Sequence, residues 1–220
     1  MTSSSTGKVF DDQVPRKRAS MTARTAPHEA ASTFSDSDLV EQSLREGERF
    51  AEVFDRHAAA VHRYLSRRIG RTLADDLTAE TFLVAFSQRE RYDTRHPDAR
   101  PWLFGIATNL LRHQQRAEIR QYRALARTGV DPVGDHMEEE VVARVVASDA
   151  HRRLAAVLAK LPAGERSVLL LIAWEQFSYD EVARALGVPV GTVRSRLHSA
   201  RKRIRAVMGD LDLITRGEME

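Results

Sequence analysis

Apolar residues recur every three or four positions along most of this chain, and no segment alternates apolar and polar residues for long enough to predict a β-strand. In the first half, this period predicts helices over residues 37–47, 48–69, 74–90 and 101–126. In the second half, it predicts helices over residues 137–160, 165–175, 178–186 and 189–208. The expected fold class is therefore all-α.

Local signals refine the first three of these helices. Ser37 is expected to cap the first helix, because a serine hydroxyl can accept a hydrogen bond from the backbone of the first turn. Thr72, followed three residues later by Asp75, resembles a capping box for the third helix. Phe54 falls on the apolar stripe of the second helix, so we expect it to be buried, and the apolar residues of the third helix are Leu77, Phe82, Leu83 and Phe86.

Breaks in the helical pattern divide the chain into two helical domains. Glycine and proline interrupt the periodicity near residue 130, where five acidic residues and no basic residue occupy positions 131–140. The N-terminal stretch is rich in serine, threonine and alanine, and it holds too little apolar surface to offset the entropy of ordering. We therefore predict a disordered extension over 1–35, a first domain over 36–127, a flexible acidic linker over 128–136, a second domain over 137–208 and an acidic tail over 209–220.

The composition narrows the class of protein. Of the 220 residues, 42% are hydrophobic and 30% are charged, and none is cysteine, which excludes a disulfide scaffold and a thiolate metal site. No apolar run is long enough to cross a bilayer, and the N-terminus lacks the apolar core of a secretory signal, so we expect a cytoplasmic protein. Basic residues gather in 100–127 and 189–208, on either side of the acidic stretch. Two basic patches favour a nucleic-acid-binding protein, although solvated helix faces would give the same charges.

The strongest local signal is a helix-turn-helix over residues 178–197. Ser178, with Glu181 three residues later, forms a capping box at the start of the first helix. Gly187 permits the left-handed backbone that the turn needs, and Pro189 suits the first turn of the second helix. Helix, turn and helix follow one another at the spacing of this DNA-binding motif.

The second helix of this motif has two faces. Its apolar face is expected to consist of Val193, Leu197, Ala200, Ile204 and Val207. One step around the helix lies a basic face that consists of Arg194, His198, Arg201 and Arg205, with Ser195 beside it. A helix of this kind fits the major groove with its N-terminal turns against the base edges. We expect Arg194, Ser195 and His198 to read bases, and we expect the phosphates to be held by Thr192, Arg201, Lys202 and Arg205.

Three sequence blocks together resemble one known family. They are an Asp-Asp-Leu-x-x-Glu-x-Phe block that begins at Asp75, a Trp-Leu-x-x-Ile-Ala-x-Asn block that begins at Trp102, and a Gly-Val-Pro-Val-Gly-Thr-Val-Arg-Ser-Arg-Leu block that begins at Gly187. In this combination and order, the chain resembles an extracytoplasmic-function (group 4) RNA polymerase sigma factor of the sigma-70 family. The resemblance covers about residues 36–208 and leaves the N-terminal extension without an assigned role.

The resemblance implies a transcription initiation factor with two partners, core RNA polymerase and promoter DNA. The implied contacts are with the clamp helices of the largest polymerase subunit and the flap of the second-largest subunit. The residues that match the polymerase-binding block are Asp75, Asp76, Leu77 and Glu80. The residues that match the family's positions for binding the melted −10 strand are Tyr92, His96, Arg100, Asn109, Arg112, Arg116 and Arg120. Ser199 joins the readers of the −35 duplex. The family also implies control by an anti-sigma factor.

Two other functions compete with this interpretation. A stand-alone helix-turn-helix regulator would bind its site tightly without polymerase. A nucleic-acid enzyme would need a metal or an acid–base cluster. His57 and His62 are five residues apart rather than four, and Asp75 and Asp76 are adjacent and point apart. We therefore predict no catalytic residue, no metal, no cofactor and no small-molecule substrate.

Overall fold

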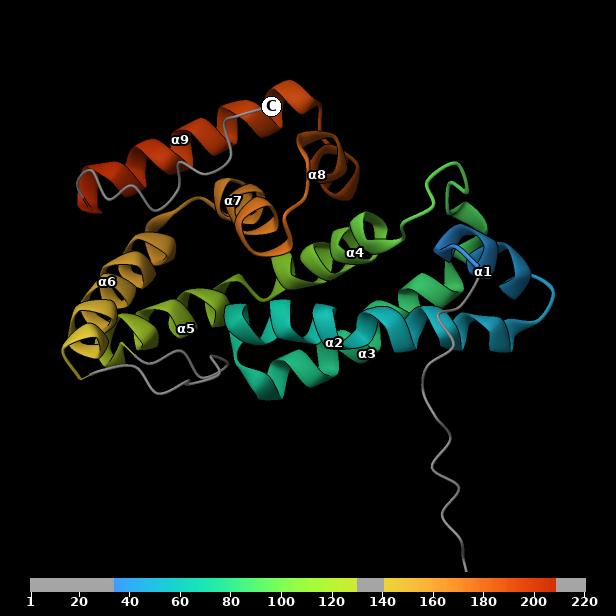
Figure 1. Cartoon of the computed structure of the whole chain (residues 1–220), viewed down its shortest axis with the longest axis horizontal. Helices are drawn as coiled ribbons and strands as arrows, with labels where there is room; N and C mark the ends of the chain where they lie inside the picture. The colour runs from blue at the N-terminus through green and yellow to red at the C-terminus, as the bar shows by residue number, and fades with distance from the viewer. Residues whose placement is uncertain (1–33, 130–140, 209–220) are drawn as a thin grey trace, which may run out of the picture. The chain divides into compact units, whose positions relative to one another are not determined.

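In the computed structural model, residues 34–129 and 141–208 are described, without the side chains of 141–148, and every regular element in these ranges is a helix (Figure 1). This confirms the all-α prediction. Residues 1–33, residues 130–140, which include most of the predicted linker, and the tail from 209 lie outside the described residues. The α-helices are α1 (Asp36–Ser43), α2 (Phe50–Ile69), α3 (Arg71–Ser87), α4 (Arg100–His113), α5 (Gln115–Thr128), α6 (Val141–Lys160), α7 (Ala163–Glu175), α8 (Tyr179–Leu186) and α9 (Val190–Met208). Across these ranges, no helix has both the length and the hydropathy that a bilayer span requires.

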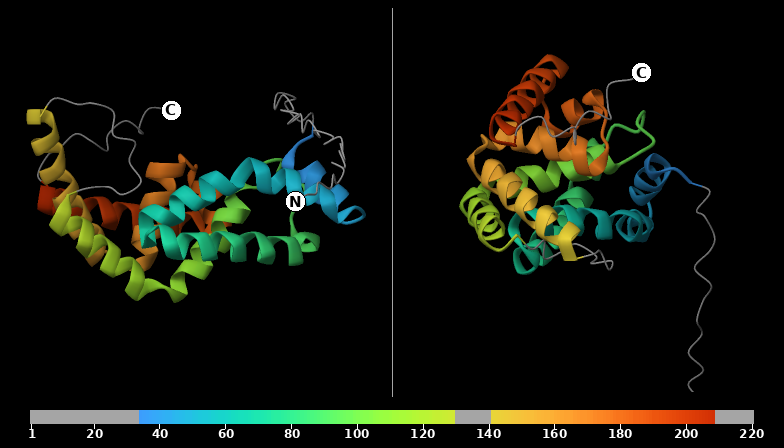
Figure 2. Two further views of the ribbon diagram at one scale, coloured as in Figure 1. Left: turned by 90° about the horizontal axis from the view of Figure 1, so that it is seen from below. Right: turned by 60° about the vertical axis from the view of Figure 1, so that its left-hand side comes forward.

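Helices α2 and α3 lie side by side and carry the core of the first half (Figure 2). Val53, Val61 and Leu65 of α2 are inaccessible to solvent, as are Leu103 and Phe104 of α4. The spacing of these residues places one apolar stripe of each helix against its neighbours, as the helical period predicts. The stripe of α2 therefore joins α3 and α4 into a single hydrophobic core.

Several local predictions were wrong. The cap of α1 is Ser35, whose hydroxyl accepts a hydrogen bond from the Asp38 N–H, and Ser37 lies inside the helix. Helix α3 starts directly after Gly70, and no side chain caps it, so Thr72 does not act as a cap. Helix α3 begins earlier than predicted because the chain turns at Gly70, where φ is +84°.

Phe54 is not buried, contrary to prediction, and the apolar Leu83 is exposed as well. The exposed fraction is 44% for Phe54 and 69% for Leu83. Phe54 lies at the rim of the α2–α3 contact, where its ring meets the ring of Phe82 edge-on at 4.8 Å. Leu83 points away from the core because Phe82, one step around α3, already occupies the buried position.

The single long helix predicted over 101–126 is two helices. Gln114 separates α4 from α5 with φ −102° and ψ 22°, and its N–H donates to the Leu111 carbonyl three residues back. The Glu118 N–H then donates to the Gln114 carbonyl and starts the next helix. The break changes the direction in which the side chains of α5 point relative to those of α4.

The second half is built on the apolar faces of α7, α8 and α9. Val168 and Leu171 of α7 pack with Val182 of α8 and with Val193 and Leu197 of α9, and all five are buried. Contacts also run between the halves, since α4 lies against α8 and α5 against α6. Residues 33–220 accordingly group into one compact unit, and the predicted two-domain division at the linker stays a prediction.

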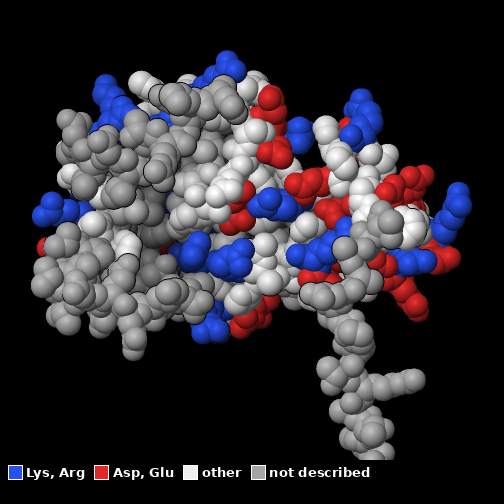
Figure 3. All heavy atoms as spheres, in the orientation of Figure 1, with Lys and Arg blue, Asp and Glu red and all other residues white. Residues whose placement is uncertain are grey.

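Acidic residues gather around α1, at the end of the molecule where this helix lies (Figures 1 and 3). The buried Asp36 connects the helices and the loop that meet at this end of the molecule. Its carboxylate accepts hydrogen bonds from Arg56 Nη1 at 2.8 Å and from the Ala99 N–H at 3.0 Å, and it lies 2.7 Å from His57 Nε2. Burial by itself raises the pKa of Asp36, but the hydrogen bonds of His57 and Ala99 dominate and lower it to about 2. One carboxylate therefore joins α1, α2 and the loop before α4.

Replacing Asp36 with asparagine should reduce stability in a pH-dependent way. The pKa is lowered from 3.8 to about 2 in the folded protein, so the stabilisation is present above pH 3.8 and is lost as the pH falls towards 2. The shift corresponds to about 2 kcal/mol at pH 7. We expect urea denaturation of the wild type and Asp36→Asn to differ by about this amount at pH 7 and to converge near pH 2.

The exposed Asp55 provides the matched control. Asp55→Asn should leave the free energy of unfolding within about 0.5 kcal/mol of the wild type at both pH values. A difference between wild type and Asp36→Asn that stays constant from pH 7 to pH 2 would contradict the role given to the Asp36 carboxylate.

Candidate nucleic-acid interface

The helix-turn-helix forms as its sequence predicts. The Ser178 hydroxyl accepts from the Glu181 N–H, and the Glu181 carboxylate accepts from the Ser178 N–H at 2.7 Å, which is a complete capping box. Gly187 adopts the left-handed conformation with φ +62°, so α8 ends there and the chain turns into α9. Both local predictions are confirmed, and together they fix the direction in which α9 leaves the turn.

Helix α9 separates an apolar face from a basic face. Val193, Leu197, Ala200 and Ile204 are buried against the rest of the second half, whereas the predicted Val207 is 55% exposed. The predicted DNA-contacting side chains on the other face are exposed at Arg194, Ser195, His198, Lys202 and Arg205 and half-buried at Thr192, Ser199 and Arg201. Arg194 reaches over the ring of Tyr179 at 6.0 Å, and no carboxylate in the described ranges pairs with it. The guanidinium therefore remains available to an outside acceptor.

Tyr92 is held more tightly than an exposed base platform would be. It is 9% exposed, its hydroxyl donates to the His96 carbonyl, and its ring lies 4.9 Å from the ring of Trp102. Burial raises the pKa of Tyr92, so the phenol stays protonated. Trp102 is half-buried beside it. The two rings form one aromatic wall between the loop and α4.

The other predicted −10 residues are distributed over the loop, α4 and α5. Asn109, Arg112, Arg116 and Arg120 are all exposed. Because Gln114 separates α4 from α5, Arg112 lies on one helix and Arg116 and Arg120 lie on the next. Arg100 is already occupied: its Nη2 donates to the Glu175 carbonyl at 3.0 Å, and its guanidinium lies 5.0 Å from the centre of the Phe177 ring.

The residues of the acidic block on α3 take three different positions. Asp76 and Glu80 are exposed on one face, and Leu77 is buried beneath them. Asp75 lies 2.7 Å from His62 Nε2 on α2, which ties the two helices together at their rim. Leu83 lies on the same face as Asp76 and Glu80, one turn further on, which makes this face partly apolar. Its exposure could not be seen in the sequence, because an apolar residue at helical spacing is usually buried.

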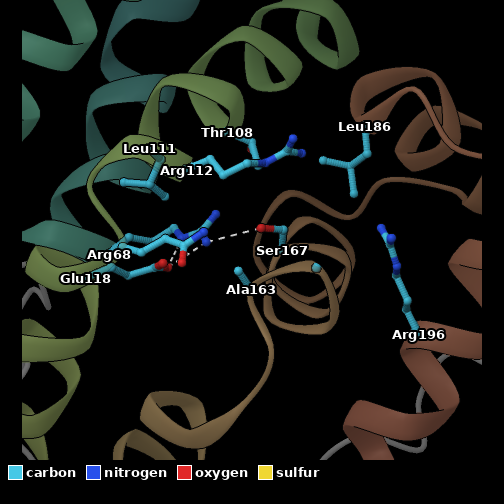
Figure 4. Close-up of a pocket in the computed structure, with 11 residues that line it drawn as sticks. Arg68, Thr108, Leu111, Arg112, Glu118, Ala163, Ser167, Leu186 and Arg196 are labelled. Carbon is cyan, nitrogen blue, oxygen red and sulfur yellow. Dashed lines mark hydrogen bonds and ion pairs between the residues drawn. The ribbon is translucent and has the colours of Figure 1, made fainter.

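A buried charge cluster was missed by the sequence reasoning. The side chains of Arg68, Glu118 and Arg166 are each no more than 2% exposed. Arg68 Nε donates to Glu118 Oε1 at 2.6 Å, and Arg166 Nη2 donates to Glu118 Oε2 at 2.9 Å. Arg68 also donates to the Ser167 hydroxyl at 3.2 Å, beside a cavity of about 40 Å³ (Figure 4). The available signal was Glu118 itself, the only acidic residue among six arginines between 100 and 127.

One group of possible metal ligands occurs among the described residues, formed by Asp36, His57 and Asp98. The Asp36 oxygens already receive hydrogen bonds from Arg56 and Ala99, as described above, and Asp98 accepts from the Arg100 N–H at 2.8 Å. These contacts tie the loop before α4 to α1 and α2. The donor set is thus explained by the fold without a metal.

An exposed basic helix presented by a helix-turn-helix defines a DNA-binding protein. Comparison with known families makes the class more specific. Residues 53–121 match the family model "Sigma-70 region 2", and residues 151–204 match "Sigma-70, region 4". These segments are called region 2 and region 4 below.

Relatives match over most of the chain. It is 32% identical over 161 residues to the ECF RNA polymerase sigma factor SigL of Mycobacterium tuberculosis, covering 72% of this chain and 88% of SigL. It is 29% identical over 181 residues to the RNA polymerase sigma factor CarQ of Myxococcus xanthus, covering 78% of this chain and 97% of CarQ. The chain belongs to the extracytoplasmic-function sigma factors of the sigma-70 family. It is a transcription initiation factor that acts with RNA polymerase at promoter DNA.

Two solved structures share the fold. The structure of CnrH in complex with the cytosolic domain of CnrY aligns with a TM-score of 0.55 and 28% identity, covering 78% of this chain and 95% of CnrH. The sigma factor RpoE of Bartonella quintana, in complex with the anti-sigma factor NepR, aligns with a TM-score of 0.50 and 22% identity, covering 73% of this chain and 96% of RpoE.

Proposed function

We propose that α9 reads the −35 element as a duplex and that α4, with the preceding loop, captures the melted −10 strand. The observation that carries this proposal is the exposed basic face of α9, set opposite the buried Val193, Leu197, Ala200 and Ile204. Arg194, Ser195 and His198 occupy the first turns, from which a recognition helix reaches base edges. Ser199 lies beside them, and Thr192, Arg201, Lys202 and Arg205 hold phosphates.

The −10 strand is captured beside the aromatic wall of Tyr92 and Trp102. A base that leaves the stack loses a few kcal/mol and must be held by ring contact and by hydrogen bonds to its edge. The exposed Asn109 offers an amide that can donate and accept at a base edge. His96 shapes the loop, and the strand phosphates are held by Arg100, Arg112, Arg116 and Arg120.

Region 2 docks on the clamp helices of the largest polymerase subunit through the exposed face of α3. Asp76 and Glu80 supply charge and Leu83 supplies apolar area, while Leu77 supports the face from beneath and Asp75 holds it to α2. Region 4 meets the flap of the second-largest subunit.

An anti-sigma factor controls the chain, in keeping with the anti-sigma complex of the similar RpoE. Polymerase performs the catalysis, and this chain supplies recognition alone.

Run-off transcription on a promoter library, with the purified chain and core polymerase, tests this function. We expect start sites that appear only when both proteins are present, with shared −35 and −10 sequences upstream. Binding should fall steeply as salt rises, because it rests on phosphate contacts. Tight binding to a specific DNA site by the chain alone would instead favour a stand-alone regulator, and a chain that never directs initiation would refute the proposal.

Asn109→Ala should impair capture of the −10 base while duplex binding at −35 stays unchanged. Loss of the hydrogen bonds to one base edge predicts a fivefold to tenfold decrease, or about 1 kcal/mol, in open-complex formation. Permanganate footprinting of the melted strand measures this decrease. Gln88→Ala removes another exposed amide, at the C-terminal end of α3, and should have no effect. Unchanged melting with Asn109→Ala would contradict the pocket assignment.

A further inference from the structure

The cavity beside Ser167 has walls that are rich in arginine (Figure 4). Its charged lining residues are three arginines and one glutamate, namely Arg68, Arg112, Arg196 and Glu118. The carboxylate of Glu118 already pairs with Arg68 and with the buried Arg166. Four guanidinium groups in and beside the cavity therefore have one carboxylate among them.

The buried part of this cluster carries more positive than negative charge. Arg68 and Arg166 are each 1% exposed, and buried charges in proteins are normally paired. Because Glu118 balances only one of the two guanidinium groups, the buried cluster keeps a net charge of about +1. The buried Nε atom of Arg166 also has no acceptor among the described residues. An anion would supply both the missing charge and the missing acceptors.

The Ser167 hydroxyl lines the cavity and has a proton that it does not donate. Ser167 is 6% exposed, and its oxygen accepts a hydrogen bond from Arg68 Nη2 at 3.2 Å (Figure 4). Within the described part of the chain, this proton has no hydrogen-bond partner. A hydroxyl can donate as well as accept, so one hydrogen bond remains for this buried group to make. A buried donor without a partner at a cavity wall points to an acceptor inside the cavity.

The first turn of α7 faces the same cavity. Ala163 and Gly164 line it, and no side chain caps this helix. The Arg166 N–H is the first of α7 to donate to a backbone carbonyl, that of Pro162. The N–H groups before it have no partner within the helix and carry a partial positive charge, which favours an anion. They add to the arginines and to the buried Ser167 hydroxyl, which point to the same chemistry.

Arg196 of α9 reaches the cavity because residue 164 is glycine. A Cβ atom on Gly164 would lie 3.2 Å from Arg196 Cζ and 3.3 Å from its Nε and Nη1, which is closer than an ordinary contact. The guanidinium of Arg196 therefore rests against the first turn of α7. Arg196 is half-buried and has no hydrogen bond or ion pair with any described residue, so its donors are available. It is not one of the α9 side chains to which the proposed function gives a role at DNA.

The size of the cavity limits the anion to a small one. Its volume is about 40 Å³. One water needs about 10–15 Å³ of such space, so the cavity has room for about three waters or for one tetrahedral oxyanion of similar bulk. Arg112 lines the cavity and is exposed, so an anion can enter from solvent beside it. The planar fork of an arginine suits the oxygens of phosphate.

We propose that this cavity binds a small phosphate-class dianion. The anion accepts hydrogen bonds from the Ser167 hydroxyl, from Arg112 and Arg196, and from the free N–H groups in the first turn of α7. Its charge balances the positive charge that Glu118 leaves uncompensated. The site goes beyond the proposed function and shares only Arg112 with the proposed DNA contacts.

Isothermal titration calorimetry of the full chain with inorganic phosphate tests the site, at an ionic strength held constant with chloride. We expect saturable binding of one anion per chain. Arg196→Gln should raise Kd by about tenfold or more, because it removes a charged hydrogen-bond donor. The matched control is Arg184→Gln, which removes an exposed arginine of α8 that does not line the cavity. It should bind phosphate as the wild type does.

Gly164→Ala is a second variant, which keeps every donor and only displaces one of them. Its added methyl group meets the guanidinium of Arg196, the far end of a flexible side chain, so the fold should not change. Circular dichroism should show the helix content of the wild type, while Kd for phosphate should rise by about threefold or more.

Adenosine monophosphate separates two sources of the phosphate group. A free anion fills the cavity without a nucleoside, so inorganic phosphate should bind at least as tightly as adenosine monophosphate. Tighter binding of the nucleotide that is lost in Arg196→Gln would support the site and assign it to the phosphoryl end of a larger ligand.

Two outcomes would overturn the site. One is the absence of saturable phosphate binding by the wild type. The other is equal binding by the wild type and Arg196→Gln, because phosphate stabilises proteins in general by exclusion from their surface, and that effect does not depend on one arginine. Either result leaves the proposed function intact, since run-off transcription tests that function separately.

Discussion

Arg194→Ala is expected to lower promoter-specific transcription by about tenfold to a hundredfold, while the protein still co-purifies with core polymerase. An arginine that donates two hydrogen bonds to a guanine edge discriminates against other bases by about 1–3 kcal/mol, and each 1.4 kcal/mol corresponds to a factor of ten. Arg194 is exposed in the first turns of α9, with no described carboxylate as a partner. The measurement is run-off transcription on a matched and a −35-scrambled template.

Arg45→Ala provides the control for the loss of an exposed arginine. Arg45 lies beyond the end of α1, away from the basic face of α9, and its removal should change transcription by less than about twofold. On the scrambled template, Arg194→Ala and wild type should be equally weak. If Arg194→Ala lost both transcription and polymerase binding, the side chain would be supporting the fold rather than reading DNA.

Glu118→Gln is expected to cause the largest loss of stability of any single charge removal in the described residues. The substitution keeps the shape of the side chain but leaves Arg68 and Arg166 buried without a counter-charge. Breaking a buried ion pair costs about 3–5 kcal/mol, because the remaining charge has lost its solvation and its partner. For a chain of this size, this corresponds to a decrease in Tm of roughly 10 °C.

Thermal and urea denaturation, each followed by circular dichroism, measure this loss. Glu48→Gln removes an exposed carboxylate and should shift Tm by less than about 2 °C. A double replacement of Glu118 and Arg166 by glutamine and methionine should recover part of the loss, since one buried cation is then removed as well. Equal Tm values for Glu118→Gln and Glu48→Gln would contradict the ion-pair assignment.

The helix-turn-helix could be predicted almost completely from the sequence because its determinants are local. The Ser178–Glu181 capping box lies within one helical turn, and the left-handed turn at Gly187 depends on a single residue. The buried Val193 and Leu197 also follow from their spacing on one helix face. None of these features requires knowledge of a distant part of the chain.

Features that depend on distant parts of the chain could not be predicted in this way. Leu83 has the spacing of a core residue, yet the position beneath it is already filled by Phe82 and the helix presents Leu83 outward. The break at Gln114 follows no proline or glycine, and the sequence reasoning therefore continued the helix. Gly105 reads as an ordinary helical glycine until Ala185 is placed against it.

The sequence by itself determined most of the helices of this sigma factor, the turn that sets the direction of α9, and the family to which the chain belongs. These properties rest on periodicity, capping and turn chemistry, which act over a few residues. The tertiary structure alone decided that Arg68, Glu118 and Arg166 share one buried site and that Arg100 engages region 4 instead of solvent. The physical reason is that the environment of a charge is set by residues about 50 to 75 positions away, and no local pattern encodes that environment.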